Sequence, residues 1–344
     1  MAAQMRIALG QMREVTHENM TFARQLGLSS VQFNTPDLPT ASGAWELGDL
    51  LWLKERCGRY GLSVEALENV PVGFYDRAML GLPGRDEQIE NYCRTIRNMG
   101  EAGIPILGYH WMPNGVWRTS STAPGRGGAH VTAFAMDEID GPLTAGAREP
   151  GPQEARGRTF SAEQMWANYE YFLKAILPVA EEAGVKLALH PDDPPVPELG
   201  AIARLFHTAD GFRRAMELVP SPNSGIDFCM GCFSEMGPDV IESIRYFGER
   251  GKILYVHFRD VQGCVPSFRE CFLGEGNVNV VRAIRTLKDV GFTGFLLDDH
   301  VPHMINDTQW GHRARAHAIG YISALLDAVN ETSIPEEVHN AVTT

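Results

Sequence analysis

Short runs rich in apolar and β-branched residues alternate, along most of this chain, with longer segments of helical periodicity. The apolar runs cover residues 6–12, 30–35, 63–71, 105–112, 186–191, 224–230, 252–261 and 293–300. Between them, apolar residues recur at spacings of three and four, as in Trp45–Tyr60, Arg85–Ala102 and Met165–Ala183. Alternating strand and helix patterns are typical of βα units whose strands form a parallel sheet. The sequence therefore predicts an α/β protein.

The number of runs favours a closed (β/α)8 barrel, the TIM barrel, over an open doubly wound sheet. Several helical segments end at a glycine just before the next run, namely at Gly61, Gly103, Gly184 and Gly291. This recurrence is expected of one repeated βα unit, and a helix over Arg313–Val329 would complete the ring. An open dinucleotide-binding sheet would carry GxGxxG after its first strand, and no such motif follows residues 6–12. We expect a single barrel domain over residues 1–330.

Two segments depart from this rhythm. Residues 113–160 are rich in Gly, Pro, Ser and Thr and separate the fourth run from its helix, which predicts a long insertion loop. The loop carries Arg118 and Arg126, and both a lid over the barrel mouth and a plain surface excursion fit it. Residues 331–344 lack helical periodicity, so we expect a poorly ordered tail or an oligomer contact.

Composition and charge narrow the possible partners. Apolar residues make up 44% of the chain and charged residues 21%, which is ordinary for a globular protein with a substantial core. The 30 Lys and Arg against 43 Asp and Glu give a net charge of -13, which disfavours nonspecific binding to nucleic acid or anionic membranes. No signal-peptide pattern and no membrane-spanning apolar run are present in the sequence. We expect a cytoplasmic enzyme that acts on a small molecule.

The six cysteines are too sparse over this length to form a disulfide framework. Cys229 and Cys232 have the CxxC spacing of redox motifs, but those motifs belong to much smaller thioredoxin-like units. No second CxxC is present to complete a zinc ribbon. We interpret the cysteines as thiols, one of which is a candidate metal ligand.

The carboxyl ends of the last four runs carry side chains that bind metals. These are His190, Asp192 and Asp193, then Asp227 and Cys229, then His257, Arg259 and Asp260, and finally Asp298, Asp299 and His300. Active sites of TIM barrels lie at the carboxyl ends of the strands, so these groups should meet. Buried groups of this kind must be paired or coordinated, which predicts a divalent metal. The candidate ligands are His190, Cys229, His257 and one of Asp298 and Asp299, a set compatible with Zn, Fe, Co or Mn.

Two arginines near these ends indicate an anionic substrate. Arg259 follows His257 by two positions and so points to the same side of the strand, and Arg118 lies just after the fourth run. Arginine commonly binds a carboxylate through two parallel hydrogen bonds, although each of these arginines could instead form a surface ion pair. A metal with arginines beside it would suit a small polyhydroxy acid.

Several motifs resemble those of the metal-dependent mannonate dehydratases, TIM barrels related to xylose isomerase. The most specific is Leu189-His190-Pro191-Asp192-Asp193-Pro194-Pro195. The others are Gly81-Leu82-Pro83, Thr95-Ile96-Arg97-Asn98, Met112-Pro113, Trp117-Arg118-Thr119, Phe228-Cys229, His257-Phe258-Arg259, Gly274-Glu275-Gly276 and Asp299-His300. They follow the family's order and approximate spacing over most of the chain.

The resemblance implies a hydro-lyase that removes water from an aldonic acid, converting D-mannonate to 2-keto-3-deoxy-D-gluconate with Mn²⁺ or Fe²⁺. It implies ligand roles for His190, Cys229, His257 and Asp299, which selects Asp299 over Asp298. The metal would stabilise the enediolate that forms when the proton beside the carboxylate leaves. His300 is adjacent to a ligand and titrates near neutrality, so it is the candidate for proton transfer. A homo-oligomer is a further expectation from the resemblance.

Four positions depart from the family pattern. Arg313 stands at the catalytic position where the family has a tyrosine, and a guanidinium cannot act as a base because it stays protonated. Val301 replaces a glycine, Val116 an acidic residue and His110 an asparagine. His110 is a candidate acid, base or substrate contact, and Asp192 is a further candidate substrate contact. These changes leave the expected metal ligands intact and alter their surroundings.

Two other functions stay open. An isomerase or epimerase of a sugar or sugar acid would use a similar metal and similar proton-transfer groups, without loss of water. A catalytically silent sugar-acid binder is the third hypothesis, and its only support is Arg313 in place of tyrosine. The mass of the product distinguishes the dehydratase from the isomerase or epimerase.

Overall fold

The computed structural model describes residues 4–139, 152–155, 157–237 and 239–331. Its main sheet is parallel and has the order β1-β15-β12-β11-β8-β5-β4-β3-β2. These strands are β1 (Arg6–Ile7), β2 (Leu9–Met12), β3 (Ser30–Asn34), β4 (Ser63–Glu68), β5 (Ile106–Tyr109), β8 (Lys186–Leu189), β11 (Ser224–Cys229), β12 (Ile253–His257) and β15 (Phe295–Leu297). Each lies within one of the eight runs predicted from the sequence.

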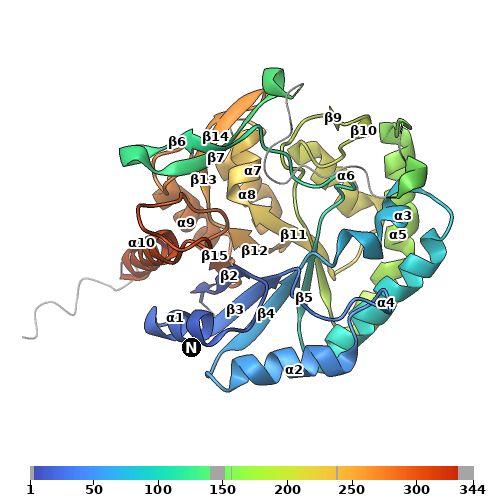
Figure 1. Ribbon diagram of the computed structural model, residues 1–344, viewed down its shortest axis with the longest axis horizontal. Coiled ribbons are helices and arrows are strands. Elements are labelled where there is room, and N and C mark those ends of the chain that lie inside the picture. Colours follow the sequence, from blue (N-terminus) through green and yellow to red (C-terminus); the bar gives the residue numbers. More distant parts are fainter. Residues whose placement is uncertain (1–3, 140–151, 156, 238, 332–344) are drawn as a thin grey trace, which may run out of the picture.

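The first run closes the barrel. It is interrupted at Ala8, so that β1 pairs with β15 while β2 pairs with β3. The two short strands thus connect both edges of the sheet, and the ring of Figure 1 results. A closed ring leaves no barrel strand with an exposed edge. The predicted α/β barrel is confirmed.

Helices form the outer ring around these strands (Figure 1). They are α1 (His17–Gln25), α2 (Leu47–Gly58), α4 (Arg85–Ala102), α5 (Ala162–Ala183), α6 (Ala209–Leu218), α8 (Val240–Gly248), α9 (Val280–Asp289) and α10 (His312–Glu331). Two shorter helices, α3 (Asp76–Leu80) and α7 (Met230–Glu235), follow β4 and β11. The helices predicted over 45–60, 85–102, 165–183 and 313–329 correspond to α2, α4, α5 and α10.

Helix α5 shows why these segments begin and end where they do. The Ser161 side chain accepts a hydrogen bond from the backbone N–H of Gln164, and the Gln164 side chain accepts one from the backbone N–H of Ser161. This capping box satisfies two amides at the helix start. At the other end Gly184 adopts a left-handed conformation, with φ of 69°, and ends the helix. Gly103 ends α4 in the same way.

The barrel interior changes character along its axis. A cluster of buried strand residues fills one part: Ala8, Ala66, Ile106, Ala188, Leu254, Tyr255, Phe295 and Leu297. The rings of Tyr255 and Phe295 stack there, with centroids 4.9 Å apart. Towards the carboxyl ends of the strands, the buried side chains become polar, as at Glu68, Asp227 and His257. The apolar layer supports a polar one above it.

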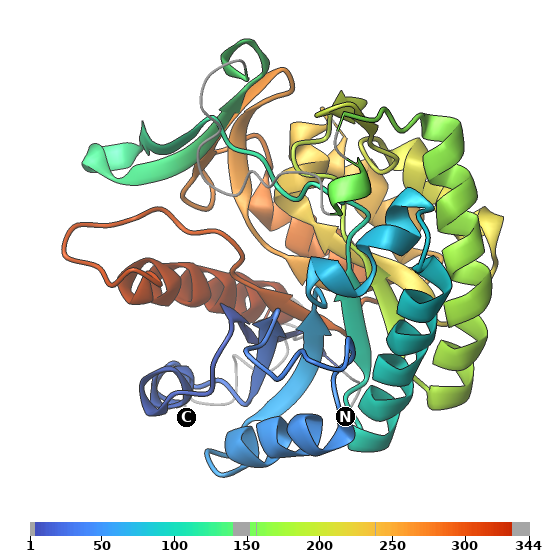
Figure 2. The same ribbon diagram turned by 45° about the vertical axis from the view of Figure 1, so that its right-hand side comes forward.

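A second sheet lies beside the carboxyl ends of the barrel strands, above α10 in Figure 2. It is antiparallel, with the order β13-β14-β7-β6. Its strands are β6 (Ser120–Pro124), β7 (His130–Ala135), β13 (Asp260–Cys264) and β14 (Ser267–Cys271). The segment predicted as a loop over 113–160 therefore contains a β-hairpin, which pairs with the hairpin after the seventh barrel strand. The run predicted over 252–261 is likewise divided between β12 and β13.

The remaining strands are the short pair β9 (Glu198–Leu199) and β10 (Ile202–Ala203). The tail predicted over 331–344 lies outside the described residues except for Glu331, the last residue of α10. Among the described residues, no helix is both long and apolar enough to cross a membrane.

Candidate metal centre and active site

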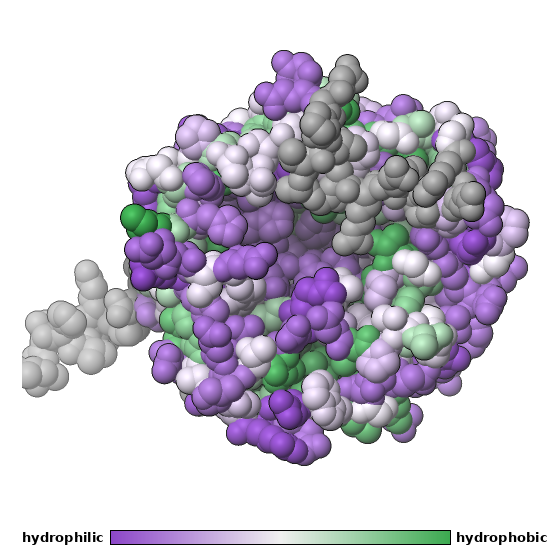
Figure 3. Space-filling view, in the orientation of Figure 1, coloured by the Kyte–Doolittle hydropathy of each residue, from purple (hydrophilic) through white to green (hydrophobic). Residues whose placement is uncertain are grey.

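A cavity of about 200 Å³ opens at the carboxyl ends of the barrel strands. The polar residues that line it are Gln11, Asn34, Thr35, Glu68, Asn69, His110, His190, Asp193, His257, Asp299 and His300. Figure 3 shows a hollow with hydrophilic walls on this face of the molecule. The cavity lies where the barrel architecture predicts chemistry, and its lining suits a hydrophilic ligand.

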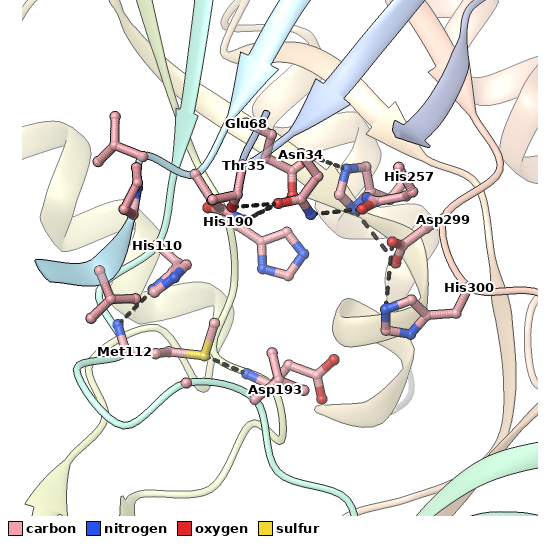
Figure 4. A pocket seen from close by; sticks show the side chains of 17 residues that line it. Asn34, Thr35, Glu68, His110, Met112, His190, Asp193, His257, Asp299 and His300 are labelled. Atoms are coloured by element: carbon pink, nitrogen blue, oxygen red, sulfur yellow. Dashed lines mark hydrogen bonds and ion pairs between the residues drawn. The ribbon is translucent and has the colours of Figure 1, made fainter. Parts of the chain in front are cut away.

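The four candidate metal ligands come together beside this cavity. Cys229 and His257 are the last residues of β11 and β12, His190 directly follows β8, and Asp299 lies two positions after β15. All four are buried. The ligand atoms of Cys229, His257 and Asp299 lie within 4.8 Å of one another. A ligand atom of His190 lies within the same distance of Cys229 in a second such group, and of His257 in a third. Figure 4 shows His190, His257 and Asp299 around one side of the cavity.

In both His190 and His257, hydrogen bonds engage one ring nitrogen and leave the other directed towards the candidate ligands. Nδ1 of His190 lies 2.7 Å from the carbonyl oxygen of Pro191, and since a carbonyl only accepts, Nδ1 carries the hydrogen and Nε2 the lone pair. Nε2 of His257 lies 2.9 Å from Oε2 of Glu68 and 3.2 Å from Oδ2 of Asp227. Carboxylates that bind the outer nitrogen of a histidine are typical of metal ligands.

Nδ1 of His257 is a buried polar atom with no hydrogen-bond partner among the described residues. It lies 3.6 Å from Oδ2 of Asp299, and that oxygen lies 3.9 Å from Sγ of Cys229. A buried nitrogen without a partner is costly, and a cation between these three atoms would remove the cost. The residues therefore fit a divalent metal ion.

The electrostatics of the group also favour a cation. Burial alone would raise the pKa of Cys229, but its hydrogen bond with Cys232 and the charge of Arg259 hold the pKa well below its ordinary value. Burial likewise opposes ionisation of Asp299, yet His300 and His257 keep its pKa well below the usual range. A thiolate and a carboxylate thus stay ionised in a buried site. Metal binding requires such deprotonated ligands.

Arg118 and Arg259 are buried and paired with protein carboxylates. Arg259 contacts Asp299 through Nε at 2.9 Å and Asp193 through Nη2 at 3.1 Å. Arg118 binds both carboxylate oxygens of Asp193 and reaches Oε1 of Glu270 at 3.1 Å. The N–H groups that the sequence analysis expected to bind a substrate carboxylate are therefore already bound to carboxylates of the protein. The geometry favours a positioning role, since Arg259 holds the candidate ligand Asp299.

His300 lines the cavity, as predicted for a proton-transfer group. Its Nδ1 lies 2.6 Å from Oε1 of Glu270, and its Nε2 lies 3.7 Å from Oδ1 of Asp299. Burial alone would raise the pKa of Glu270, but the charges of His300, Arg259 and Arg118 lower it, so Glu270 accepts the Nδ1 hydrogen as a carboxylate. Burial opposes a charged ring, but the carboxylates of Asp299 and Glu270 raise the pKa of His300 above its ordinary value.

Two other predicted site residues lie away from the cavity. Asp192 is buried, where its Oδ2 accepts a hydrogen bond of 2.6 Å from the backbone N–H of Phe206. Arg313 is exposed on the first turn of α10 and donates to the carbonyl of Ile305 at 3.1 Å. Arg315 is the buried arginine of this helix, and it binds Asp298 at 2.8 Å. Asp298 is therefore paired with Arg315 and does not join the cluster of candidate ligands, which is consistent with Asp299 as the carboxylate ligand.

Three further acidic residues complete the site, of which the sequence analysis named only Asp227, as a strand-end group. Glu68 and Asp227 hold His257, and Glu270 holds His300. Glu68 ends β4, so the rule that found the ligands could have found it as well. Glu270 belongs to β14 of the second sheet, and no local pattern marks it.

Sequence comparison identifies the relatives of this chain. The family model described as D-mannonate dehydratase (UxuA) matches residues 4–335. The chain belongs to the D-mannonate dehydratase family. Mannonate dehydratase 2 of Halalkalibacterium halodurans is 34% identical over 314 residues, which cover 84% of this chain and 89% of the relative. Mannonate dehydratase of Streptococcus pneumoniae is 32% identical over 320 residues, covering 88% and 85%.

Solved structures agree. The crystal structure of mannonate dehydratase from Streptococcus suis serotype 2 matches with a TM-score of 0.86 and 30% identity, and covers 96% of each chain. A xylose isomerase domain protein from Planctomyces limnophilus matches with a TM-score of 0.63 and 15% identity over 95% of this chain and 99% of its own. At this identity the second match shows the fold alone. The predicted xylose isomerase-like barrel and the resemblance to mannonate dehydratases are both confirmed.

The four positions that the sequence analysis expected to depart from the family pattern differ in their relation to the cavity. His110 and Val116 line it. Val301 borders a neighbouring cavity of about 410 Å³, which also reaches His300 and Asp299. Arg313 lines neither. The departures that bear on a bound molecule are therefore on the cavity walls.

Proposed function

We propose that this member of the D-mannonate dehydratase family is a metal-dependent hydro-lyase that removes water from an aldonic acid, with D-mannonate as the first candidate. The product would be a 2-keto-3-deoxy sugar acid. The observation that carries the proposal is the buried Nδ1 of His257, which has no hydrogen-bond partner among the described residues and lies beside Cys229 and Asp299 at the cavity. Membership of the family supports dehydration over isomerisation.

His190, Cys229, His257 and Asp299 would hold the metal, with Mn²⁺ or Fe²⁺ preferred. When bound, such an ion acts as a Lewis acid towards the substrate oxygens and lowers the energy of negative charge that develops on them. Glu68 and Asp227 fix the ring of His257, and Arg259 fixes the carboxylate of Asp299. Ligands held in this way need no rearrangement when the ion binds.

His300 would move the proton. In its neutral form, with the Nδ1 hydrogen held by Glu270, His300 can accept at Nε2 the proton from the carbon beside the substrate carboxylate. The electrons of that C–H bond form the new carbon–carbon double bond as the neighbouring C–O bond breaks. His300 then returns a proton to the departing hydroxyl, which leaves as water, and the enol rearranges to the keto acid. One imidazole can serve both transfers.

The test is incubation of the metal-loaded protein with a panel of aldonates, with mass and keto-acid content of the products as the readout. Loss of one water from at least one aldonate, with a keto acid formed, is the expected result. Products of unchanged mass would favour the isomerase or epimerase alternative. No conversion of any aldonate, together with tight binding of one of them, would indicate a silent sugar-acid binder.

A further inference from the structure

Three amide side chains and one hydroxyl form a connected group on one wall of the cavity. They belong to Gln11, Asn34, Thr35 and Asn69. Gln11 lies in β2, Asn34 ends β3, and Thr35 and Asn69 directly follow β3 and β4. In Figure 4, Asn34 and Thr35 lie together on one side of the cavity, next to Glu68. We call these four residues the amide wall, and the reaction proposed above assigns none of them a role.

The carboxylate of Glu68 fixes the orientation of two of these amides. Its Oε1 lies 3.4 Å from Nδ2 of Asn34 and 3.3 Å from Nδ2 of Asn69. Since a carboxylate only accepts hydrogen bonds, both residues turn their NH₂ groups towards it. Oδ1 of Asn34 then accepts from Nδ2 of Asn69 at 3.3 Å and from the hydroxyl of Thr35 at 3.1 Å. Nδ2 of Asn34 also donates to Oε1 of Gln11 at 2.6 Å, so the amide of Asn34 is saturated.

This network leaves one acceptor and one donor of the amide wall without partners. Nδ2 of Asn69 uses both of its hydrogens, but Oδ1 of Asn69 is a buried atom with no hydrogen-bond partner among the described residues. Gln11 accepts through Oε1, and its Nε2 has no partner within residues 4–139, 152–155, 157–237 and 239–331. Polar atoms in such places are normally hydrogen-bonded, so these two indicate a polar group of a bound molecule.

The backbone of the amide wall adopts an uncommon conformation. Gln11, Thr35 and Asn69 have φ of 60°, 45° and 57°, in the left-handed region. Few residues other than glycine adopt this region, and a β-branched residue such as Thr35 does so under strain. At Gln11 the backbone is held from both sides, because its N–H donates to Oε1 of Gln32 at 2.9 Å and its carbonyl accepts from Nε1 of Trp310 at 3.1 Å. Strained positions of this kind cluster at ligand sites, and three of them on consecutive strands fit a preorganised binding wall.

A sugar hydroxyl matches both atoms, because a hydroxyl donates one hydrogen bond and also accepts. One hydroxyl of a bound polyol can accept from Nε2 of Gln11, and another can donate to Oδ1 of Asn69. A carbon without its hydroxyl would leave one of these atoms without a partner. A site built to bind a hydroxyl rejects such an analogue more strongly than an apolar pocket rejects a poorly fitting group.

We propose that the amide wall determines specificity for the hydroxylated chain of the substrate, with Nε2 of Gln11 as the donor to one hydroxyl and Oδ1 of Asn69 as the acceptor from another. The inference rests on the proposed dehydration of a sugar acid. That reaction breaks bonds at the second and third carbons of the acid, so the hydroxyls in question belong to the fourth, fifth or sixth. Neither contact transfers a proton.

Deoxy analogues test the two contacts. Calorimetric titration of D-mannonate and of its 4-deoxy, 5-deoxy and 6-deoxy analogues into the Mn²⁺-loaded parent measures what each hydroxyl contributes to affinity. Two of the analogues should each bind about tenfold or more weakly than D-mannonate, because each leaves a polar atom of the wall unpaired.

Two variants connect these losses to the wall. Gln11→Met keeps the length of the side chain without the donor, and Asn69→Gly removes the acceptor at a φ that glycine adopts freely. In each variant, the preference for D-mannonate over one of the two analogues should fall to about threefold or less, with a different analogue for each variant. Gln25→Met, at an exposed position of α1, is the control and should keep the preferences of the parent. Thermal unfolding midpoints and Mn²⁺ content verify that the fold is kept.

Preferences that are the same in the parent and in both variants would contradict the proposal. So would a parent that binds all three analogues as tightly as D-mannonate. Conversion of D-mannonate, measured in parallel, separates this inference from the proposed function. The expected changes in affinity without any conversion overturn only the dehydratase, and conversion without these changes overturns only the amide wall. Absence of both binding and conversion overturns both.

Discussion

Nε2 of His257 lies 2.9 Å from Oε2 of Glu68, although the two residues are 189 positions apart in the chain. The barrel brings them together because β4 and β12 both end at the same rim. This contact turns Nδ1 of His257 towards Cys229 and Asp299. A residue outside the proposed ligand set thereby controls the orientation of one proposed metal ligand.

Glu68→Gln should therefore weaken metal binding without removing a ligand. Loss of the ionised partner leaves the ring orientation and basicity of His257 less well defined, and such changes typically reduce metal affinity by about 10- to 100-fold. Calorimetric titration with Mn²⁺ measures the effect. Glu101→Gln, at an exposed position of α4, is the matched control and should bind as the parent does. Equal Mn²⁺ affinity in Glu68→Gln would refute the supporting role.

His300→Asn should abolish most turnover and keep the metal. The substitution removes the group proposed to carry the proton, which is typically worth about 10²- to 10⁴-fold in rate. Steady-state kinetics with the best aldonate and metal analysis of the purified protein are the measurements. His317→Asn, an exposed position on α10, serves as the control. Substantial turnover by His300→Asn would remove this residue from the mechanism.

Arg259→Met should destabilise the fold. The guanidinium lies between Glu235, Asp193 and Asp299, and its loss leaves buried carboxylates without their partner. Breaking a buried ion pair in this way costs about 3–5 kcal/mol of unfolding free energy. Denaturant unfolding measures the change, with the exposed pair member Arg97→Met as the control, which should stay within about 0.5 kcal/mol. A free energy of unfolding for Arg259→Met within the range of the control would contradict the account.

Glu270 should contribute to stability at neutral pH and lose that contribution in acid. Burial acts to raise its pKa, but His300, Arg259 and Arg118 lower it below the ordinary value. A carboxyl whose folded pKa is depressed stabilises the fold above its unfolded pKa of about 4.3, and this stabilisation is lost as the pH falls. The unfolding free energy measured between about pH 6 and pH 3 should therefore fall less steeply for Glu270→Gln than for the parent. Equal slopes of the unfolding free energy against pH in the two proteins would show that the ionisation of Glu270 is not linked to folding.

The metal group was predictable because it depends on one regular feature. Parallel barrel strands end at one rim, so His190, Cys229, His257 and one of Asp298 and Asp299 could be grouped from their positions at the ends of apolar runs. The resemblance to the family then selected Asp299. Glu270 could not be found in this way. It reaches the site through the β13–β14 hairpin, in which Glu270 lies opposite Val261, and the sequence analysis treated residues 252–261 as a single strand.

Arg313 illustrates a different difficulty, the phase of a helix. A motif match locates a residue along the chain only to within one or two positions. Side chains two positions apart on a helix point in directions that differ by about 200°. Arg313 is consequently exposed, while Arg315 is buried against Asp298. The arginine pairs show a third limit, since the sequence reveals the cations Arg118 and Arg259 but not that Asp193 and Glu270 already bind them.

The most direct test of the metal-dependent dehydration is keto-acid formation from D-mannonate and related aldonates before and after removal of metal with a chelator. We expect conversion by the loaded protein, none after chelation, and recovery on addition of Mn²⁺ or Fe²⁺. Cys229→Ser should not recover, whereas Cys264→Ser, at an exposed thiol, should recover fully. Keto-acid formation that persists in the chelated protein, or in Cys229→Ser to the same extent as in the parent, would contradict the account.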